Sequence, residues 1–296
     1  YDLQSNFQHT IHQKNTDSVT EFPVEKAKKK LPKKSTIVFE HKENNWSEFN
    51  RERLIPQMNH NDGPALANAD LNKDGITDFY IGGGKNQTGA LFISDGADFK
   101  KIQTPFEISN RSEDTDAIFF DGDQDGDFDL IVTSGGKSFS KFSSDLDDRY
   151  YENIGGANFV IKKKAFSFRT HFSSSAVGTG DFNGDGAIDL VIGERFDLKT
   201  YGKKASIHLL LNQGHGTFSE TLVSDFKEVG MVTDLIVSDL NQDGWPDLVA
   251  CGEWMPISVW INSKGSFSDQ TDQYGLAKTN GLWNALFIKD INQDSI

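Results

Sequence analysis

Carboxylate and amide side chains recur along this chain at one fixed spacing. Each complete copy places Asp or Asn at positions 1, 3 and 5 of a nine-residue loop, Gly at position 6 and Asp at position 9. Four copies are complete and begin at Asp70, Asp121, Asp181 and Asp239, and a fifth begins at Asp290 and is truncated. Oxygen ligands without His or Cys select hard cations, and several carboxylates on a flexible loop favour Ca²⁺ over Mg²⁺. The spacing therefore predicts about four calcium sites, and a fifth if the last loop is completed.

The expected ligands are the side chains at positions 1, 3, 5 and 9 and the main-chain carbonyl of position 7. Glycine at position 6 permits the sharp turn that brings these oxygens together. The loop differs from an EF-hand because Asp at position 9 closes it and a strand, not a helix, follows. The predicted ligands are Asp70, Asn72, Asp74, Ile76 and Asp78; Asp121, Asp123, Asp125, Asp127 and Asp129; Asp181, Asn183, Asp185, Ala187 and Asp189; Asp239, Asn241, Asp243, Trp245 and Asp247; and Asp290, Asn292 and Asp294.

A single loop of this kind is also compatible with an Asx-rich turn that binds nothing. Four matches with similar flanks favour the metal, because crowded carboxylates repel one another without a cation. The loop that begins at Asp121 carries an additional carboxylate, Asp123, and is expected to bind calcium most tightly. No catalytic motif accompanies the loops, so calcium is expected to hold strands together.

Short apolar strands flank every loop, and the loop starts lie 51, 60, 58 and 51 residues apart. Each unit reads as a strand before the loop, an apolar strand after it, a third strand, a Gly turn and a more polar fourth strand. Four short strands per unit predict an all-β fold, a β-propeller of four-stranded blades, with a strand solenoid as the competing architecture. The predicted blades lie near residues 62–108, 114–168, 173–225 and 231–275, and the next begins at 281–296.

Composition limits the classes of partner. The formal net charge is −14, which argues against nucleic acid or an anionic membrane as the main partner. No apolar run approaches the ~20 residues of a membrane-spanning helix. Residues 1–36 contain a Lys-rich run interrupted by Pro32 and are expected to be a linker or the tail of a preceding domain, followed by a strand at Ile37–Glu40. Cys251 is the only cysteine and is expected to be a buried thiol.

These motifs resemble the FG-GAP repeats of integrin α-subunit propellers and the bacterial VCBS-type repeats, in particular surface proteins similar to cartilage acidic protein. The resemblance includes Gly63-Pro64-Ala65-Leu66-Ala67 before the first loop and Ile81-Gly82-Gly83 after it, and it covers residues 37–296. It implies a seven-bladed parent, of which this chain holds four blades and the start of a fifth. It also implies an extracellular, cell-surface or periplasmic location and neighbouring domains in a longer chain.

The resemblance also implies calcium loops on one face and partner contacts on the other. The opposite face would then include 85–89, 134–148, 194–204 and 253–256, of which 134–148 is the longest and the best candidate for a contact.

Three functions remain open at this point. The first is a non-catalytic adhesion or protein-binding module, the second is carbohydrate binding, and the third is a calcium-dependent polysaccharide lyase. A lyase would need a basic residue in a cleft, for which Arg195 and His171 are candidates. Carbohydrate binding would use exposed aromatic rings, although such rings in strands more often belong to the core. The candidates are Trp245, Trp254, Trp260 and Trp283.

Overall fold

The computed structural model describes residues 37–59, 62–96, 98–168 and 172–289. The chain divides into two units, Tyr1–Lys34 and Ser35–Ile296, and the description below concerns the second. The predicted Lys-rich linker of residues 1–36 lies outside the described residues.

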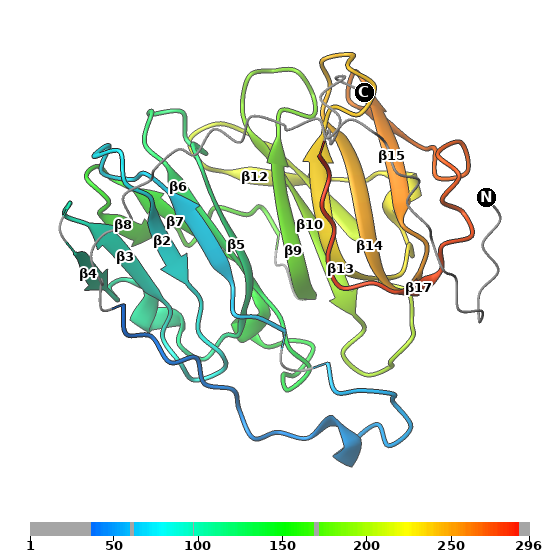
Figure 1. Cartoon of the computed structure of the whole chain (residues 1–296), viewed down its shortest axis with the longest axis horizontal. Helices are drawn as coiled ribbons and strands as arrows, with labels where there is room; N and C mark the ends of the chain where they lie inside the picture. Colours follow the sequence, from blue (N-terminus) through cyan, green and yellow to red (C-terminus); the bar gives the residue numbers. More distant parts are fainter. Residues whose placement is uncertain (1–36, 60–61, 97, 169–171, 290–296) are drawn as a thin grey trace, which may run out of the picture. The chain divides into compact units, whose positions relative to one another are not determined.

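Four antiparallel sheets follow one another along the chain, each with its strands in sequence order (Figure 1). The strands are β1 (Leu66–Ala69), β2 (Asp78–Ile81), β3 (Ala90–Ser94) and β4 (Phe99–Ile102); β5 (Asp114–Phe120), β6 (Asp129–Ser134), β7 (Arg149–Asn153) and β8 (Phe159–Ile161); β9 (Ser173–Gly180), β10 (Asp189–Phe196), β11 (Ile207–Asn212) and β12 (Phe218–Thr221); and β13 (Met231–Ser238), β14 (Asp247–Met255), β15 (Ser258–Ser263) and β16 (Ser266–Asp269). Short 3₁₀ turns occur at η1 (Glu48–Asn50), η2 (Phe106–Ser109), η3 (Ser144–Leu146) and η4 (Ser224–Phe226). The predicted all-β fold of four-stranded, propeller-type sheets is confirmed.

The predicted metal loops each connect the first and second strands of a sheet. The position-9 aspartate begins the second strand in every sheet, as in the pairing of Asp78 with Ala69 at the edge of the first loop. The second strands are apolar, and all six residues of β6 are buried. A strand covered on both faces has no solvent side, which explains why these segments do not alternate between apolar and polar residues.

Aromatic side chains fill the spaces between neighbouring sheets. Phe106 lies between Tyr80 of the first sheet and Tyr151 of the second, with ring centroids 5.0 and 4.9 Å away. In the fourth sheet, Trp260 packs edge-on against Phe226 at 5.5 Å. Rings at these separations and angles contribute beyond the area that they bury. Hydrophobic contact between successive sheets therefore forms the core of the fold.

A repeated hydroxyl bond also joins the inner strands of successive sheets. Thr115 Oγ1 donates to the carbonyl of Ser174 in the next sheet at 2.9 Å. Ser175 Oγ donates in the same way to the carbonyl of Val232 at 2.8 Å. Each of these residues stands six positions before the first aspartate of its loop. The inner strands are thus linked by side chains that the repeat places in register.

Two predicted strands are not formed. Ile37–Glu40 is irregular, because no neighbouring strand pairs with it in the described part of the chain. Residues 284–289, predicted as the first strand of a fifth sheet, also lack strand pairing; instead β17 (Gly281–Leu282) pairs with β14. In the other sheets the first strand pairs with the strand after the loop, and the corresponding residues here lie outside the described chain.

Residues 284–289 nevertheless make the contacts of an inner strand. Thr233 Oγ1 donates to the carbonyl of Trp283 at 2.8 Å, and the Leu286 N–H donates to Asp234 Oδ2 at 2.7 Å. Both contacts repeat those between the second and third sheets, where the Val177 N–H donates to Asp116 Oδ2 at 2.9 Å. This segment is therefore docked in the position of the next sheet.

No helix in the described residues is long and apolar enough to cross a membrane.

Candidate metal centre

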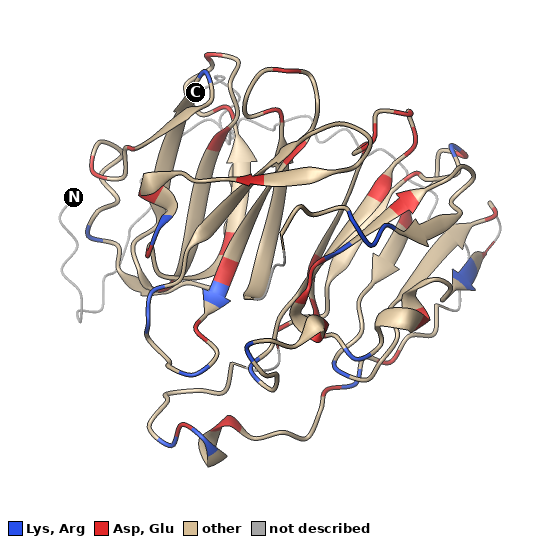
Figure 2. Cartoon of the chain, turned by 180° about the vertical axis from the view of Figure 1, so that it is seen from behind, with Lys and Arg blue, Asp and Glu red and all other residues tan. Residues whose placement is uncertain are grey.

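The four complete loops share one end of the sheets, where Figure 2 shows acidic residues gathered. Within each loop the main-chain N–H of position 6 donates to the position-1 carboxylate, as from Gly75 to Asp70 at 2.8 Å. Glycine occupies this position with φ between +81° and +91° in the four loops, a conformation that a side chain disfavours. The glycine conformation and the aspartate spacing together draw the oxygen ligands of each loop inward.

The loop that begins at Asp121 brings three carboxylates together. Ligand oxygens of Asp121, Asp123 and Asp129 all lie within 4.8 Å of one another. Asp121 Oδ1 is buried and has no hydrogen-bond partner among the described residues. Burial, reinforced by the neighbouring Asp125, raises the pKa of Asp123. Convergent oxygen donors with an unsatisfied buried oxygen fit a hard divalent cation.

The other three loops have Asn at position 3, so they contain one carboxylate fewer at the side-chain ligand positions 1, 3, 5 and 9. Their position-6 N–H bonds follow the same pattern, as in the 2.9 Å contacts from Gly186 to Asp181 and from Gly244 to Asp239. In these loops, however, the position-1 Oδ1 also accepts the N–H of position 5, as in the 3.1 Å contact from Asp185 to Asp181. These loops therefore share the position-6 turn of the Asp121 loop, with a neutral amide in place of its second carboxylate. The truncated fifth loop lies outside the described residues.

The aspartate at position 9 also has a structural role within its sheet, which the loop spacing alone did not indicate. In all four loops this carboxylate is buried and accepts one N–H from position 2 and another from the end of the third strand. For Asp189 the donors are Phe182 at 3.0 Å and Asn212 at 2.8 Å. Burial raises the pKa of Asp129 and of Asp189 to about 6, against the lowering effect of these hydrogen bonds. The position-9 carboxylate thus ties the loop to its own sheet.

Asparagines at the end of the third strand connect neighbouring loops. The side-chain amide of Asn212 donates to the carbonyl of Gly122 at 2.8 Å, and that of Asn262 donates to the carbonyl of Phe182 at 3.0 Å. Both acceptors are position 2 of the preceding loop. The sequence contained a signal for this role, because Asn153, Asn212 and Asn262 recur at one position before a turn, but it was not recognised.

Position 4 of each of the first three loops contacts the next loop. Lys73 Nζ pairs with Asp127 at 3.0 Å, and Gln124 Nε2 donates to the carbonyl of Gly186 at 2.9 Å. Gly184 lies so close to the ring of Trp245 that a Cβ there would be 2.5 Å from it. The Trp245 side chain is therefore held against the preceding loop, and the four loops form one connected row.

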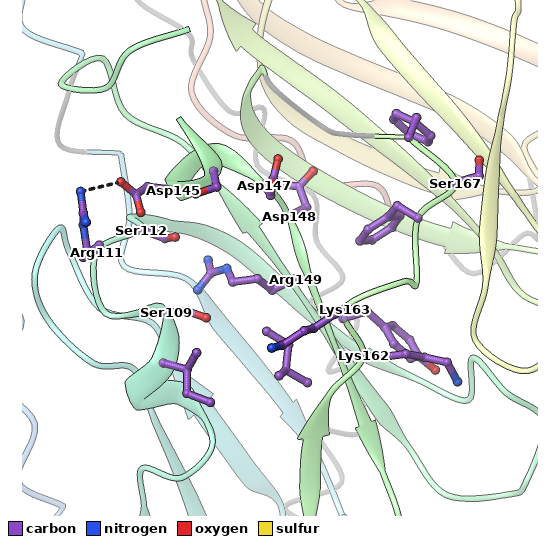
Figure 3. A pocket seen from close by; sticks show the side chains of 16 residues that line it. Ser109, Arg111, Ser112, Asp145, Asp147, Asp148, Arg149, Lys162, Lys163 and Ser167 are labelled. Atoms are coloured by element: carbon purple, nitrogen blue, oxygen red, sulfur yellow. Dashed lines mark ion pairs between the residues drawn. The ribbon is translucent and has the colours of Figure 1, made fainter. Parts of the chain in front are cut away.

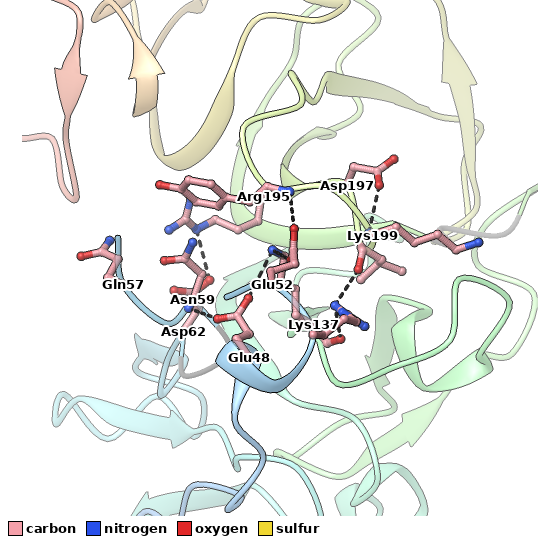
Figure 4. Close-up of polar contacts among 12 residues, drawn as sticks. Glu48, Glu52, Gln57, Asn59, Asp62, Lys137, Arg195, Asp197 and Lys199 are labelled. Carbon is pink, nitrogen blue, oxygen red and sulfur yellow. Dashed lines mark hydrogen bonds and ion pairs between the residues drawn. The ribbon is translucent and has the colours of Figure 1, made fainter. Parts of the chain in front are cut away.

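The opposite end of the sheets contains the loops that were predicted to contact a partner. Part of this end is covered by the chain itself, because residues 48–59 lie across it (Figure 4). Arg51 donates to the carbonyls of Lys137 at 3.1 Å and Leu198 at 2.7 Å, which belong to the second and third sheets. Gln57 reaches Glu253 of the fourth sheet at 3.1 Å. One segment therefore fastens three sheets together.

Two cations at this end are buried in ion pairs. Lys137 is fully buried between Glu48 at 3.2 Å and Glu52 at 2.5 Å. Arg195 is 4% exposed and pairs with Asp62 at 3.1 Å and Glu253 at 2.6 Å. Arg195 thus lies in a closed ion-pair cluster at the end opposite the metal loops. The second lyase candidate, His171, lies outside the described residues.

The tryptophan candidates separate into two groups. The core interpretation holds for Trp260, which is 1% exposed. It is wrong for Trp254 and Trp283, which are 56% and 39% exposed; Trp254 lies at an irregularity of the strand pairing, between Glu253 and Met255. Trp254 Nε1 donates to Tyr201 Oη at 3.0 Å, so its ring edge is fixed at the surface. Cys251 is buried, as expected.

The buried carboxyl group of Glu113 makes the stability of the folded chain depend on pH. Its carboxyl group is buried, and neither oxygen has a hydrogen-bond partner among the described residues. Burial, with Glu43 and Asp62 nearby, raises the pKa of Glu113 from 4.5 to about 9, although Lys85 opposes the shift. The folded chain therefore keeps a proton that the unfolded chain releases above its ordinary pKa, so stability falls as pH rises from about 4.5 to about 9.

We expect Glu113→Gln to raise the melting temperature by several degrees at pH 8 and to change it little at pH 5, because glutamine removes this titration. Thermal unfolding followed by circular dichroism at the two pH values checks this, with Glu107→Gln, an exposed glutamate on η2, as the control. A Glu113→Gln variant less stable than the parent at pH 8 would show that the folded chain uses the ionised carboxylate.

The chain was compared with protein families, curated proteins and solved structures. Residues 239–296 match the model of the FG-GAP-like repeat. No curated protein matches the sequence. Among solved structures, a lectin from Agrocybe aegerita described as recognising non-reducing terminal N-acetylglucosamine is similar with a TM-score of 0.47 and 20% identity. The V. cholerae biofilm matrix protein Bap1 is similar with a TM-score of 0.35 and 16% identity.

These alignments are partial. They cover 72% and 69% of this chain, and the chain spans 52% of the lectin and 30% of the biofilm protein. The family match begins at the fourth metal loop and includes β14, β15 and β16 and the docked segment after them. The chain is an all-β protein of four-stranded, propeller-type sheets, and its residues 239–296 match the FG-GAP-like repeat.

Proposed function

We propose that this chain is a calcium-stabilised, non-catalytic module for adhesion or ligand binding in a larger extracellular protein. The observation that carries the calcium assignment is the Asp121 loop, with three convergent carboxylates and a buried oxygen that lacks a partner among the described residues. A hard cation at this position relieves the repulsion among the carboxylates and satisfies that oxygen.

Calcium in this proposal acts as a structural ligand. Each of the four complete loops lies between the first two strands of a sheet, and these loops contact one another through positions 4, 6 and 7. A cation bound only by the folded loops stabilises the folded state by mass action. Arg195, one of the two lyase candidates, is committed to its ion pairs with Asp62 and Glu253.

The ligand-binding part of the proposal rests on surface that the fold leaves available. Residues 48–59 cover loops near Lys137, Leu198 and Glu253. A partner that binds this end of the sheets must therefore contact the surface beside residues 48–59. The loop 135–148 retains an accessible portion, because Ser144 and Asp145 line an open cavity. A protein or a carbohydrate partner remains the proposed class, and nucleic acid is not.

Two measurements test the proposal. Isothermal titration of metal-free chain with calcium is expected to show about four sites, one of them lost in Asp121→Asn. Labelled chain with calcium is then screened against immobilised glycans and extracellular matrix proteins, and saturable binding without turnover is expected. Heat-neutral calcium titration contradicts the calcium role, and unsaturated products released from an acidic polysaccharide contradict the non-catalytic role.

A further inference from the structure

A cavity of about 480 Å³ lies on the flank of the second sheet (Figure 3). Three connections enclose it: residues 108–112 leading into β5, the end of the loop 135–148, and residues 161–168 leading from β8 toward β9. Its volume lies within the range of pockets that hold small molecules. The loop that was predicted as the best partner contact therefore forms one wall of a pocket.

The floor of this pocket is held rigidly by internal bonds. Arg149 donates to Asp114 at 2.7 Å, which fixes its guanidinium group within the second sheet. Asp148 accepts the Ser134 N–H at 2.8 Å and the Ser174 hydroxyl at 2.9 Å. Burial raises the pKa of Asp148 to about 7, so its negative charge is reduced at neutral pH. A pocket whose floor does not need to reorganise loses less entropy when a ligand binds.

Two cations on the rim remain available to a ligand. The Arg111 side chain is 76% exposed and pairs with Asp145 at 3.3 Å, a long contact in an exposed position. Lys163 is exposed and makes no ion pair within the described part of the chain. Lys162 differs, because it already pairs with Glu152 at 2.5 Å. Figure 3 shows Arg111 on one side of the pocket and Lys163 on another, so the two cations flank a ligand that binds between them.

The other lining groups restrict the charge and the shape of that anion. Asp145 and Asp147 place carboxylates in the same wall, which disfavours a polyanion such as a polyphosphate. Ser109, Ser112 and Ser167 provide hydroxyl groups that exchange hydrogen bonds with a polyol. Phe166 and Phe168 add aromatic surface, with ring centroids 6.5 Å apart. The combination fits a polyhydroxylated ring that carries one negative charge.

We propose that this pocket binds a carboxylated sugar unit, a uronic acid residue of a saccharide, between Arg111 and Lys163. This rests on the proposed ligand-binding function and names the ligand class and the site. Sugar hydroxyl groups donate to the carboxylates of the wall and exchange hydrogen bonds with the serines, and the apolar face of the ring lies on the phenylalanines.

The test uses the whole chain in calcium-containing buffer and NMR titration with methyl β-D-glucuronide. Its methyl ester and methyl β-D-glucoside are the uncharged controls. We expect the glucuronide to bind and both neutral sugars to bind at least about tenfold more weakly, since each lacks a charge-assisted hydrogen bond. Arg111→Gln and Lys163→Gln each weaken glucuronide binding about tenfold, whereas Lys164→Gln, the adjacent exposed lysine outside the pocket, leaves it unchanged.

The possible results distinguish an error in the assigned pocket from an error in the proposed binding function. Arg111 and Lys163 are exposed, so their variants are expected to keep the parent's melting temperature. Equal binding of the glucuronide and its ester, or unchanged binding in both variants, overturns the assigned site while glycan binding itself stands. Absence of glucuronide binding to the parent chain also overturns the site. Absence of binding to every glycan and protein in the screen overturns the proposed function as well.

Discussion

Removal of divalent cations is expected to lower the melting temperature of this chain by about 10–20 °C. With free calcium about tenfold above the dissociation constant, each site contributes roughly 1.4 kcal/mol of stability, and four sites contribute about 5–6 kcal/mol. That sum is comparable with the whole stability of many domains. The row of contacts from Lys73 through Gln124 to Gly184 suggests that loss of calcium from one loop also loosens its neighbour.

Differential scanning calorimetry in calcium and in excess chelator measures this effect. Asp121→Asn removes one carboxylate from the three-carboxylate loop and should reduce the calcium-dependent part of the shift. Asp272→Asn, at an exposed acid outside the loops, is the matched control and should behave like the parent chain. Identical melting curves with and without chelator would exclude a structural role for calcium.

The sequence predicted the features that depend on local, repeated chemistry. Glycine at position 6 and aspartate at position 9 occur in every complete loop, and the strands on either side follow from the apolar segments beside them. A turn and its flanking strands are specified within a few residues, so their prediction does not require the tertiary fold. The confirmed four-stranded sheets are the result of this local coding.

Features that depend on distant partners were missed. Lys137 and Glu52 are 85 positions apart, and nothing near either residue in the sequence indicates that both will be buried. The polar and charged side chains of residues 48–59 are likewise compensated by groups far away in the sequence, as in the contact of Gln57 with Glu253. The same reason explains the incorrect strand at Ile37–Glu40, since β-structure requires a neighbour that the local sequence does not specify.

The Asn212 and Asn262 contacts are an intermediate case. Their repetition at one position was visible in the sequence, but the acceptors belong to the preceding sheet. Their role becomes evident only when two adjacent sheets are placed together. The Asp121 loop similarly combines a visible signal, the extra Asp123, with a feature that only the structure provides, the unsatisfied Asp121 Oδ1.

Substitution of Lys137 by methionine is expected to destabilise the chain by about 3–5 kcal/mol, because it leaves buried glutamates without their cation. Both Lys137 and Glu48 are fully buried, and Lys137 also lies 5.1 Å from the ring centre of Phe196. Methionine retains most of the apolar contact with that ring, so the effect isolates the charge. For a chain of this size the expected decrease in melting temperature is about 6–20 °C.

Thermal unfolding of three variants in calcium-containing buffer measures this prediction. Lys203→Met removes the lysine of an exposed pair, with Asp197 at 2.8 Å, and should leave the melting temperature within experimental error. Adding Glu48→Met and Glu52→Gln to Lys137→Met should recover part of the loss, because the uncompensated charges are removed with the cation.

A Lys137→Met variant as stable as the parent would show that residues 48–59 do not fasten the sheets, and the covered end would then be available to a partner. Since calcium and this segment act at opposite ends of the sheets, the destabilisation by Lys137→Met should add to that caused by chelator without a large coupling energy.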